Sequence, residues 1–443
     1  MAIDWKLIII LVLNLFLSAT YSMPFSIFPV IALSRDISLG VIGLIFSLFP
    51  LGSIIISLIF AKMMKVWGRV KLLIITSVLL GLSTMIFGLI IHIENNTTFI
   101  IVACVSRVIQ GMACGGFCTV AYAIIALLYR ESILEKETYM VLFFTVGVAI
   151  GPVIGGVLYE HINYEFPNYL FAAISFLTIP SVFLIPQDAD GIKGEEKKPV
   201  KISNFMKNSR FVFTVGLIVV NFSGFTFIYA AIVKHMETFD CGPTTAGLFI
   251  AEIIMSYFAS MVLLNFLPKK IDRRVWLFLG CILEFISFFL AGPEPYLLFP
   301  KSLIFVGIGL FLVGFGGGLS ILPILPELID VGTFNIKEDS EAVGDMASAF
   351  NNMGFQVGEF FGPILGSQLT SAVGFEHGCS LYSLVILIYA FTYLAFGKGY
   401  EAFGRKRRAS KANTGLQLAA TDIAKYDKLL NNELRGGLLI NRL

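Results

Sequence analysis

Twelve long apolar segments dominate this sequence and limit what it can fold into. A helix that crosses the hydrocarbon core of a bilayer needs about 20 predominantly apolar residues, and each segment is long enough. The 443 residues are 57% hydrophobic and 14% charged, with a mean hydropathy of +0.85, which excludes an ordinary soluble domain. The expected spans are residues 7–33, 41–63, 71–93, 99–128, 138–160, 168–186, 210–235, 244–267, 274–292, 301–328, 343–373 and 379–397.

A polar stretch divides these segments six and six. Residues 187–209 are charged and lack periodicity, whereas the other connections are short. We therefore predict an all-α integral membrane protein with twelve transmembrane helices in two six-helix bundles, residues 1–186 and 210–397. The stretch 187–209 is expected to be a cytoplasmic linker, and residues 398–443 a cytoplasmic, largely disordered tail.

Lys and Arg fall mostly on one side of the predicted membrane. With both termini in the cytoplasm, only Arg35, Lys234 and Lys301 lie in or near the outer connections, which is the positive-inside pattern. The acceptor sequons at Asn95 and Asn96 also lie outside, and their glycosylation is left open. The net charge of +2 resides in the loops and predicts no nucleic-acid partner. A plasma membrane and an acidic vesicle membrane fit equally well.

A glycine pattern lies in the fifth segment, in the string GVAIGPVIGG. Gly147, Gly151 and Gly155 are four residues apart, so a helix places them on one face, where a second helix can approach closely. Pro152 has no backbone N–H and is expected to kink or loosen this helix. Gly156 completes the string. The pattern predicts a close-packed, bendable helix that takes part in gating.

The same pattern recurs in the eleventh segment. GPVIGG at 151–156 is repeated as GPILGS at 362–367, and 362 − 151 = 211 residues. Gly362, Pro363 and Gly366 are therefore predicted to share the packing and gating role. Two six-helix halves in parallel register are typical of transporters with an internal repeat.

The fourth segment carries a positive charge inside an apolar run. Arg107 and Gln110 lie three residues apart on one helix face, and Gly111 follows. A charge at mid-bilayer costs about 3 kcal/mol on insertion scales, so it normally faces a bundle interior or an aqueous cavity. We predict that Arg107 and Gln110 contact a substrate or a proton site, the alternative being a structural interior ion pair.

These two strings resemble signatures of the major facilitator superfamily, in its twelve-helix drug/proton antiporter branch. The pattern G-x-x-x-G-P-x-x-G-G matches residues 147–156, and R-x-x-Q-G matches residues 107–111. SMPFSIFPVIA at 22–32, LPILPELID at 322–330 and GPILGS at 362–367 are similar to the vesicular amine/polyamine (solute carrier 18) group. The resemblance implies alternating access and proton-driven exchange of organic cations or polyamines.

The loop after the second segment departs from a third signature of that superfamily. Gly68 and Arg69 match it, whereas Ala61, Lys65 and Val66 replace a glycine, an aspartate and an arginine. The basic cluster is still expected to act as a gating latch, or else only as positive-inside charge. Its candidate acidic partners are Glu341 and Asp345. The loop PKKIDRR at 268–274 is a second copy.

Four carboxylates lie in or at the ends of the later segments: Glu252, Glu284, Glu327 and Glu359. Burial disfavours the charged form of a carboxyl group, so a buried one can exchange a proton near neutral pH or bind a cation. Glu359 and Glu284 lie nearest mid-membrane, and Glu252 in the outer half. Glu327 follows two prolines and is as readily a structural cap. Asn351 and Gln356 approach Glu359 and join it as predicted binding residues.

Polar side chains in the first and seventh segments point to the same central region. These are Asn14, Ser18, Thr20, Tyr21, Ser22, Ser26, Asn221, Ser223, Thr226 and Tyr229. Most hydroxyls of this kind are expected to bond their own helix carbonyls. Tyr229, Tyr257 or Phe355 are candidates for a cation-binding aromatic cage.

The prediction is a secondary active transporter, most simply a proton-coupled antiporter of organic cations, monomeric and without cofactor or metal. Two alternatives remain open: a facilitator or proton symporter of a neutral or anionic solute, with Arg107 as the anion site, and a non-transporting receptor or scaffold. No nucleophile–base pair, metal cluster or phosphate loop is found, so an enzyme is not expected. The basic string at 404–410 predicts contact with anionic lipid, and phosphorylation of Ser410 is left open.

Overall fold

The computed structural model describes residues 4–129, 132–185, 202–266, 271–292, 301–335 and 340–404. Residues 1–399 form one compact unit, and residues 400–443 form a second unit whose described part holds the short helix α17 (Glu401–Gly404). Most of the predicted linker and tail, including Ser410, lie outside the described residues.

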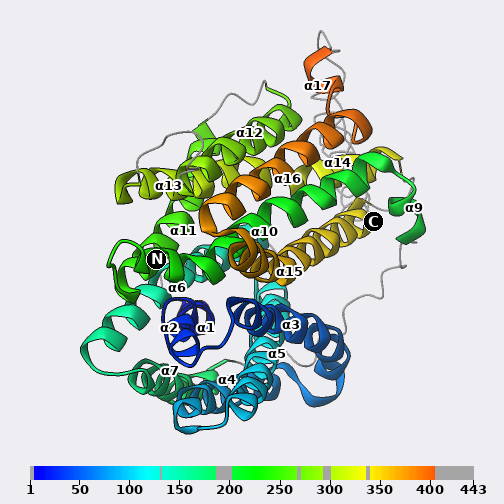
Figure 1. Ribbon diagram of the computed structural model, residues 1–443. Coiled ribbons are helices and arrows are strands. Elements are labelled where there is room, and N and C mark those ends of the chain that lie inside the picture. The colour runs from blue at the N-terminus through cyan, green and yellow to red at the C-terminus, as the bar shows by residue number, and fades with distance from the viewer. Residues whose placement is uncertain are drawn as a thin grey trace, which may run out of the picture. The chain divides into compact units, whose positions relative to one another are not determined.

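Every regular element among the described residues is helical (Figure 1). The first half of the chain contains α1 (Trp5–Ser22), α2 (Pro24–Ser34), α3 (Leu39–Trp67), α4 (Arg69–Leu89), a 3-10 turn (Ile90–His92), α5 (Asn96–Leu128), α6 (Ile133–His161), α7 (Glu165–Leu177) and α8 (Ile179–Val182). The second contains α9 (Ile202–Met206), α10 (Ser209–Glu237), α11 (Pro243–Phe266), α12 (Arg273–Ala291), α13 (Leu303–Ile321), α14 (Ile324–Asn335), α15 (Ser340–Val373) and α16 (Phe375–Phe396).

These helices confirm ten of the twelve predicted spans. Ten helical stretches among the described residues are long and apolar enough to cross a membrane. The remaining two predicted spans correspond to the interrupted pair α7 and α8, and to the more polar α15. The first and tenth spans are each divided into two helices, immediately before Pro24 and at Pro323. Apolar side chains such as Leu177, which is 77% exposed, lie on the surface, as they do in a lipid-facing protein.

Side chains and glycines define where the helices begin and end. The Asp4 carboxylate accepts from the backbone N–H of Lys6 at 3.2 Å, and Asn95 accepts from Thr98 N–H at 3.1 Å, so each caps a helix start. Gly68 and Gly374 have φ of +79° and +88°, values that favour glycine, and they let the chain reverse between adjacent long helices.

The predicted glycine face of α6 packs against the first span. A Cβ at Gly147 would overlap the Leu15 carbonyl oxygen, and one at Gly151 would overlap the Ala19 carbonyl oxygen. Gly155 continues the same line against α2. Helix α6 runs through Pro152 as one element, and the kink or loosening expected there stays a prediction.

The second half repeats this packing with α15 against α10. Gly358, Gly362 and Gly366 lie against the backbone carbonyls of Val219, Ser223 and Phe227, respectively. Figure 1 shows α15 running alongside α10. The repeat of 211 residues found in the sequence is therefore a repeat of helix packing.

Candidate functional site

The two halves of the chain are joined deep in the fold by a hydrogen bond between side chains. The Tyr21 hydroxyl, at the end of α1, donates to Glu359 Oε1 on α15. Tyr21 is 7% exposed, whereas Glu359 retains partial exposure. Gln356, one turn earlier on α15, donates weakly to the Ser53 hydroxyl of α3 at 3.4 Å. Glu359 and Gln356 thus lie at the contact between the halves, where the sequence predicted a site.

Arg107 is completely buried and enclosed by aromatic rings. Its guanidinium carbon lies 4.9 Å from the centroid of Phe49 and 5.5 Å from that of Phe46, and Phe25 and Tyr21 are within 6.0 Å. Aromatic faces attract a cation, more strongly where water is excluded. This enclosure offsets part of the cost of burying the charge.

The polar contacts of Arg107 connect it to Tyr21 and Gln110. One terminal nitrogen donates to Gln110 Oε1 at 2.9 Å and, weakly, to the Tyr21 carbonyl at 3.4 Å. Gln110 in turn reaches Thr84 Oγ1 on α4 at 3.4 Å. The other terminal nitrogen and Nε have no hydrogen-bond partner among the described residues. Because Tyr21 contacts Arg107 through its carbonyl and Glu359 through its hydroxyl, it links the two opposite charges, which also act on each other electrostatically.

The other predicted carboxylates lie away from this central contact. Glu252 is on α11, with Oε2 facing Gly307 of α13, and Glu284 is sealed between α12 and α13. Asn351 lies two turns before Glu359 on α15 and is partly exposed. Of the predicted aromatic cage, Tyr229 reaches the centre by stacking on Phe25 at 5.0 Å.

Tyr257 and Phe355 pack elsewhere, against Phe225 and Phe222. Most of the hydroxyls in the first span bond their own helix, as expected: Thr20 donates to the Phe16 carbonyl at 2.7 Å. The importance of Phe25, Phe46 and Phe49 was missed, because no spacing distinguishes three residues among 42 phenylalanines.

A further contact closes the two halves at the end where α6 finishes. The Glu160 carboxylate accepts from the backbone N–H of Thr244 at 2.9 Å and from its hydroxyl at 2.6 Å. Gly156 packs on Thr244, Gly247 packs on the Pro152 carbonyl, and Gly43 of α3 packs on the Pro363 carbonyl. Of the predicted packing glycines, Gly156 thus contacts the other half directly, and Gly247 and Gly43, which were not predicted, make the other two contacts.

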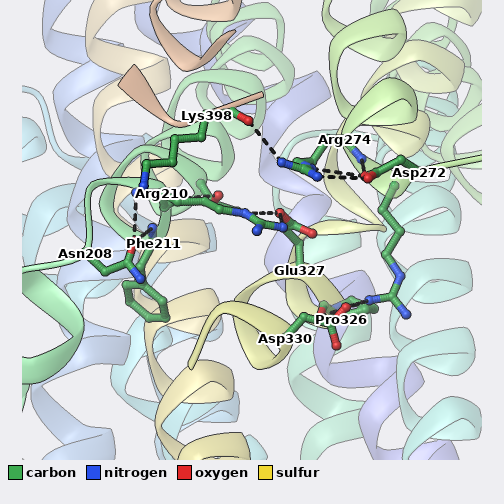
Figure 2. Close-up of polar contacts among 11 residues, drawn as sticks. Asn208, Arg210, Phe211, Asp272, Arg274, Pro326, Glu327, Asp330 and Lys398 are labelled. Carbon is green, nitrogen blue, oxygen red and sulfur yellow. Dashed lines mark hydrogen bonds and ion pairs between the residues drawn. The ribbon is translucent and has the colours of Figure 1, made fainter. Parts of the chain in front are cut away.

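An ion-pair cluster lies where α10 and α12 begin, and Figure 2 shows its members converging from α10, α12 and α14. Arg210 donates from Nε to Glu327 Oε1 at 2.7 Å, and the Glu327 side chain is 3% exposed. Arg274 pairs with Asp272 at 2.9 Å and donates to the Lys398 carbonyl at 3.0 Å. Partial burial of Asp272 opposes ionisation, but the hydrogen bonds from Arg274 outweigh it and lower the pKa of that carboxyl.

The corresponding loop of the first half has a different composition. Gly68 separates α3 from α4, and Arg69 is the first residue of α4. The side chains of Lys65, Glu341 and Asp345 lie outside the described residues, so the expected latch between them stays a prediction. Val66, in the last turn of α3, is 79% exposed.

Comparison with known proteins agrees with this architecture. Residues 10–331 match the Major Facilitator Superfamily profile. The mouse (Mus musculus) MFS-type transporter SLC18B1 is 26% identical over 91% of this chain and 88% of its own length. The mouse synaptic vesicular amine transporter is 25% identical over 55% of this chain and 45% of its own length.

Solved structures show the same fold at low identity. The nucleoside transporter NupG aligns with a TM-score of 0.71 at 11% identity, covering 91% of this chain and 100% of NupG. A D-xylose-proton symporter aligns with a TM-score of 0.69 at 13% identity, covering 89% and 98%. Each of these proteins is named as a transporter or symporter. By its family profile and its fold, the chain belongs to the Major Facilitator Superfamily of membrane transporters.

Proposed function

We propose that this transporter exchanges organic cations, polyamines among them, for protons, and that proton and cation compete for Glu359. The observation that carries the proposal is the Tyr21–Glu359 hydrogen bond between the two halves. In an alternating-access transporter the contact between the two halves opens and closes. A carboxylate at this contact can therefore couple the opening to the binding of a proton or a cation. If a proton and a cation bind one group in turn, the binding of one releases the other.

The environment of Glu359 supports a cation rather than an anion as the substrate. Glu359 keeps partial exposure, so a solute can reach it. Arg107, the anion site of the alternative reading, is completely buried behind Tyr21 and three phenylalanines. An anion would have to displace that aromatic enclosure to reach the guanidinium. We assign Arg107 the role of an internal counter-charge that acts through Tyr21.

The arrangement of contacts is consistent with one state of an alternating-access cycle. With the predicted topology, Glu160 and Thr244 lie on the outer side, and their contact closes that side. Opening it requires α6 to separate from α11, which Gly156 and Gly247 allow without side chains interlocking across the contact. We further propose cytoplasmic termini, a monomer, and a plasma or acidic vesicle membrane. The similarity to a synaptic vesicular amine transporter agrees with a cationic substrate.

The test is exchange by the purified full-length protein in liposomes with an acidic interior and an enclosed pH-sensitive dye. Spermidine, and separately the permanently charged tetraethylammonium, are added outside. Exchange of an entering cation for a proton raises the internal pH. We expect a rise with at least one of these cations, and its loss in Glu359→Gln, which keeps the shape of the side chain but carries no charge.

Two controls make the result specific. Protein-free liposomes measure the passive entry of neutral amine, which tetraethylammonium cannot form. Glu252→Gln removes a membrane carboxylate remote from Tyr21, and we expect it to retain exchange. If the internal pH falls when a neutral or anionic solute is added, the protein is a symporter. If the internal pH does not change with either cation, the proposal is overturned.

A further inference from the structure

A second membrane carboxylate, Glu284, is enclosed within the second half and plays no part in the contact with Tyr21. It lies on α12 and is 1% exposed. A Cβ at Gly317 of α13 would overlap its Oε1 atom, so the carboxyl group points directly at the glycine-rich face of that helix. Gly280, one turn earlier on α12, packs on the Gly316 carbonyl and on Ser320. The absence of side chains at these glycines brings the two helices together around the carboxyl group.

Neither oxygen of Glu284 has a hydrogen-bond partner among the described residues. The facing helix cannot supply a donor, because interior N–H groups of an α-helix are bonded to the carbonyl four residues earlier. Ser320 is close enough to interact with Glu284, and its hydroxyl also donates to the Gly317 carbonyl at 3.0 Å. The Ser320 hydroxyl is a single neutral group that can donate one hydrogen bond or accept one, and it brings no charge to balance a carboxylate.

Within the described part of the chain, the remaining polar groups that act on Glu284 are already paired, and none is a cation. From α12 itself, Cys281 interacts with Asn221 of α10, with an Asn221 Nδ2 to Sγ distance of 3.5 Å. From α16, the Tyr382 hydroxyl donates to the Val220 carbonyl at 2.7 Å. Helix α13 contains no titratable residue. Phe225 of α10 completes the enclosure by packing against Gly317.

This inventory distinguishes the two protonation states. A carboxylate is an acceptor only, and here it would be buried without a counter-ion and with at most the Ser320 hydroxyl as a donor, which is strongly unfavourable. A neutral carboxylic acid has one O–H to donate, and the surroundings offer acceptors in Ser320 and the helix carbonyls. The neutral acid is therefore the form that this site accommodates.

We infer that Glu284 is a second proton-binding site, separate from Glu359, and that its bound proton holds α12 against α13. Loss of the proton would place a negative charge between α12 and α13. The two helices would then separate, and the residues at their contact would become exposed. The ligand of this site is a proton alone, because a bulkier ligand would meet the backbone of α13. The inference rests on the geometry of the second half and does not require the proposed substrate.

Infrared spectroscopy tests the protonation state directly. The spectrum of the full-length protein in lipid at neutral pH is compared with that of Glu284→Gln, whose amide copies the shape of the neutral acid. We expect the difference spectrum to lose the carbonyl stretch of one protonated carboxylic acid, with the carboxylate bands unchanged. Loss of carboxylate bands instead would overturn the inference. Because the readout is not transport, failure here is independent of any failure of the proposed exchange at Glu359.

Accessibility of the adjacent thiol tests the coupling between the proton and the contact of α12 with α13. Cys281 is 1% exposed, and its labelling by a membrane-permeant maleimide is followed by peptide mass spectrometry at rising pH. In wild type we expect the labelling of Cys281 to rise severalfold more steeply with pH than in Glu284→Gln. The glutamine cannot become charged, so this variant measures how the reactivity of the thiol itself changes with pH. Equal slopes in the two proteins would show that the proton does not hold the helices together.

Discussion

In the first half of the chain, three glycines of α6 pack against the first span, and Val148 follows the first of them. In the second half, three glycines of α15 pack against α10, and Glu359 follows the first of those. The two positions correspond, because 359 − 211 = 148. Val148 is 8% exposed and makes no polar contact, whereas Glu359 binds Tyr21 across the halves. The helix packing is therefore repeated, and the chemistry is placed on one copy.

The same asymmetry applies where the helices begin. The second half holds the buried pair Arg210–Glu327 and the pair Arg274–Asp272 (Figure 2). The corresponding loop of the first half has a lysine and a valine at two of the positions where the superfamily signature has charged residues. The comparison indicates that the repeat supplies two similar scaffolds and that the second carries most of the membrane carboxylates.

Exchanging the residues at the two corresponding positions should have the largest effect. Glu359→Val gives the second half the composition of the first, and we expect a folded protein whose exchange falls to the level of protein-free liposomes. Val148→Glu places an unpaired carboxyl group at a buried position, and we expect a loss of folded protein. Gel filtration and the liposome assay measure both. Exchange that survives in Glu359→Val would contradict the role of this carboxylate.

Breaking the buried ion pair should destabilise the second half. Glu327→Gln leaves the Arg210 charge without its partner, and we expect unfolding to become easier by about 3–5 kcal/mol. Asp330→Asn is the matched control, because the Asp330 side chain is 63% exposed and its pair with Arg273 should contribute only about 0–1 kcal/mol. Thermal unfolding in detergent measures both. Equal shifts in the two variants would show that burial does not distinguish the pairs.

Adding a side chain at a glycine where two helices pack should lower the free energy of unfolding by less than breaking the buried ion pair does. Gly362→Val places a side chain against the Ser223 carbonyl, and Gly151→Val does the same against the Ala19 carbonyl, so each should destabilise by about 1–3 kcal/mol. A Cβ at Gly344 meets nothing within 4 Å, and Gly344→Ala should stabilise by about 0.5–1 kcal/mol through helix propensity. If only one of Gly362→Val and Gly151→Val lowers stability, the packing of α15 on α10 and that of α6 on α1 are not equivalent.

Removing the hydroxyl of Tyr21 should have an effect similar in size to filling a glycine contact. Tyr21→Phe keeps the ring against Phe49 but deletes the donor to Glu359, and a hydrogen bond to a charged group is worth about 1.5–3 kcal/mol. We expect initial exchange rates to fall about tenfold or more. Thr20→Val is the control, because Thr20 donates only within its own helix. If both variants transport equally well, Tyr21 does not act through Glu359.

Much of the fold could be predicted from the sequence, because membrane spans depend on local properties. Apolar length, the glycine spacing of α6 and α15, and the repeat between them do not require knowledge of distant contacts. The effect of a proline was less predictable: α6 continues through Pro152, whereas the first span is divided immediately before Pro24. Whether neighbouring helices support the backbone after a proline depends on packing, which the local sequence does not specify.

The candidate site was only partly predictable for the same reason. Arg107, Gln110, Gln356 and Glu359 were identified because charge and polarity are rare in apolar segments. Pairing was not visible: nothing in the sequence indicates that Tyr21, 338 residues before Glu359, provides its donor. Nor does it indicate that three phenylalanines enclose Arg107, since their role depends on how α2, α3 and α5 come together.

Proton release on substrate binding is the measurement that tests the central claim most directly. The purified protein is placed in weakly buffered solution with a pH indicator, and spermidine or tetraethylammonium is added at saturation. If proton and cation compete for Glu359, binding should release protons from wild type and none from Glu359→Gln, while Glu252→Gln behaves as wild type. Saturable binding without proton release, or release that is unchanged in Glu359→Gln, would contradict the account.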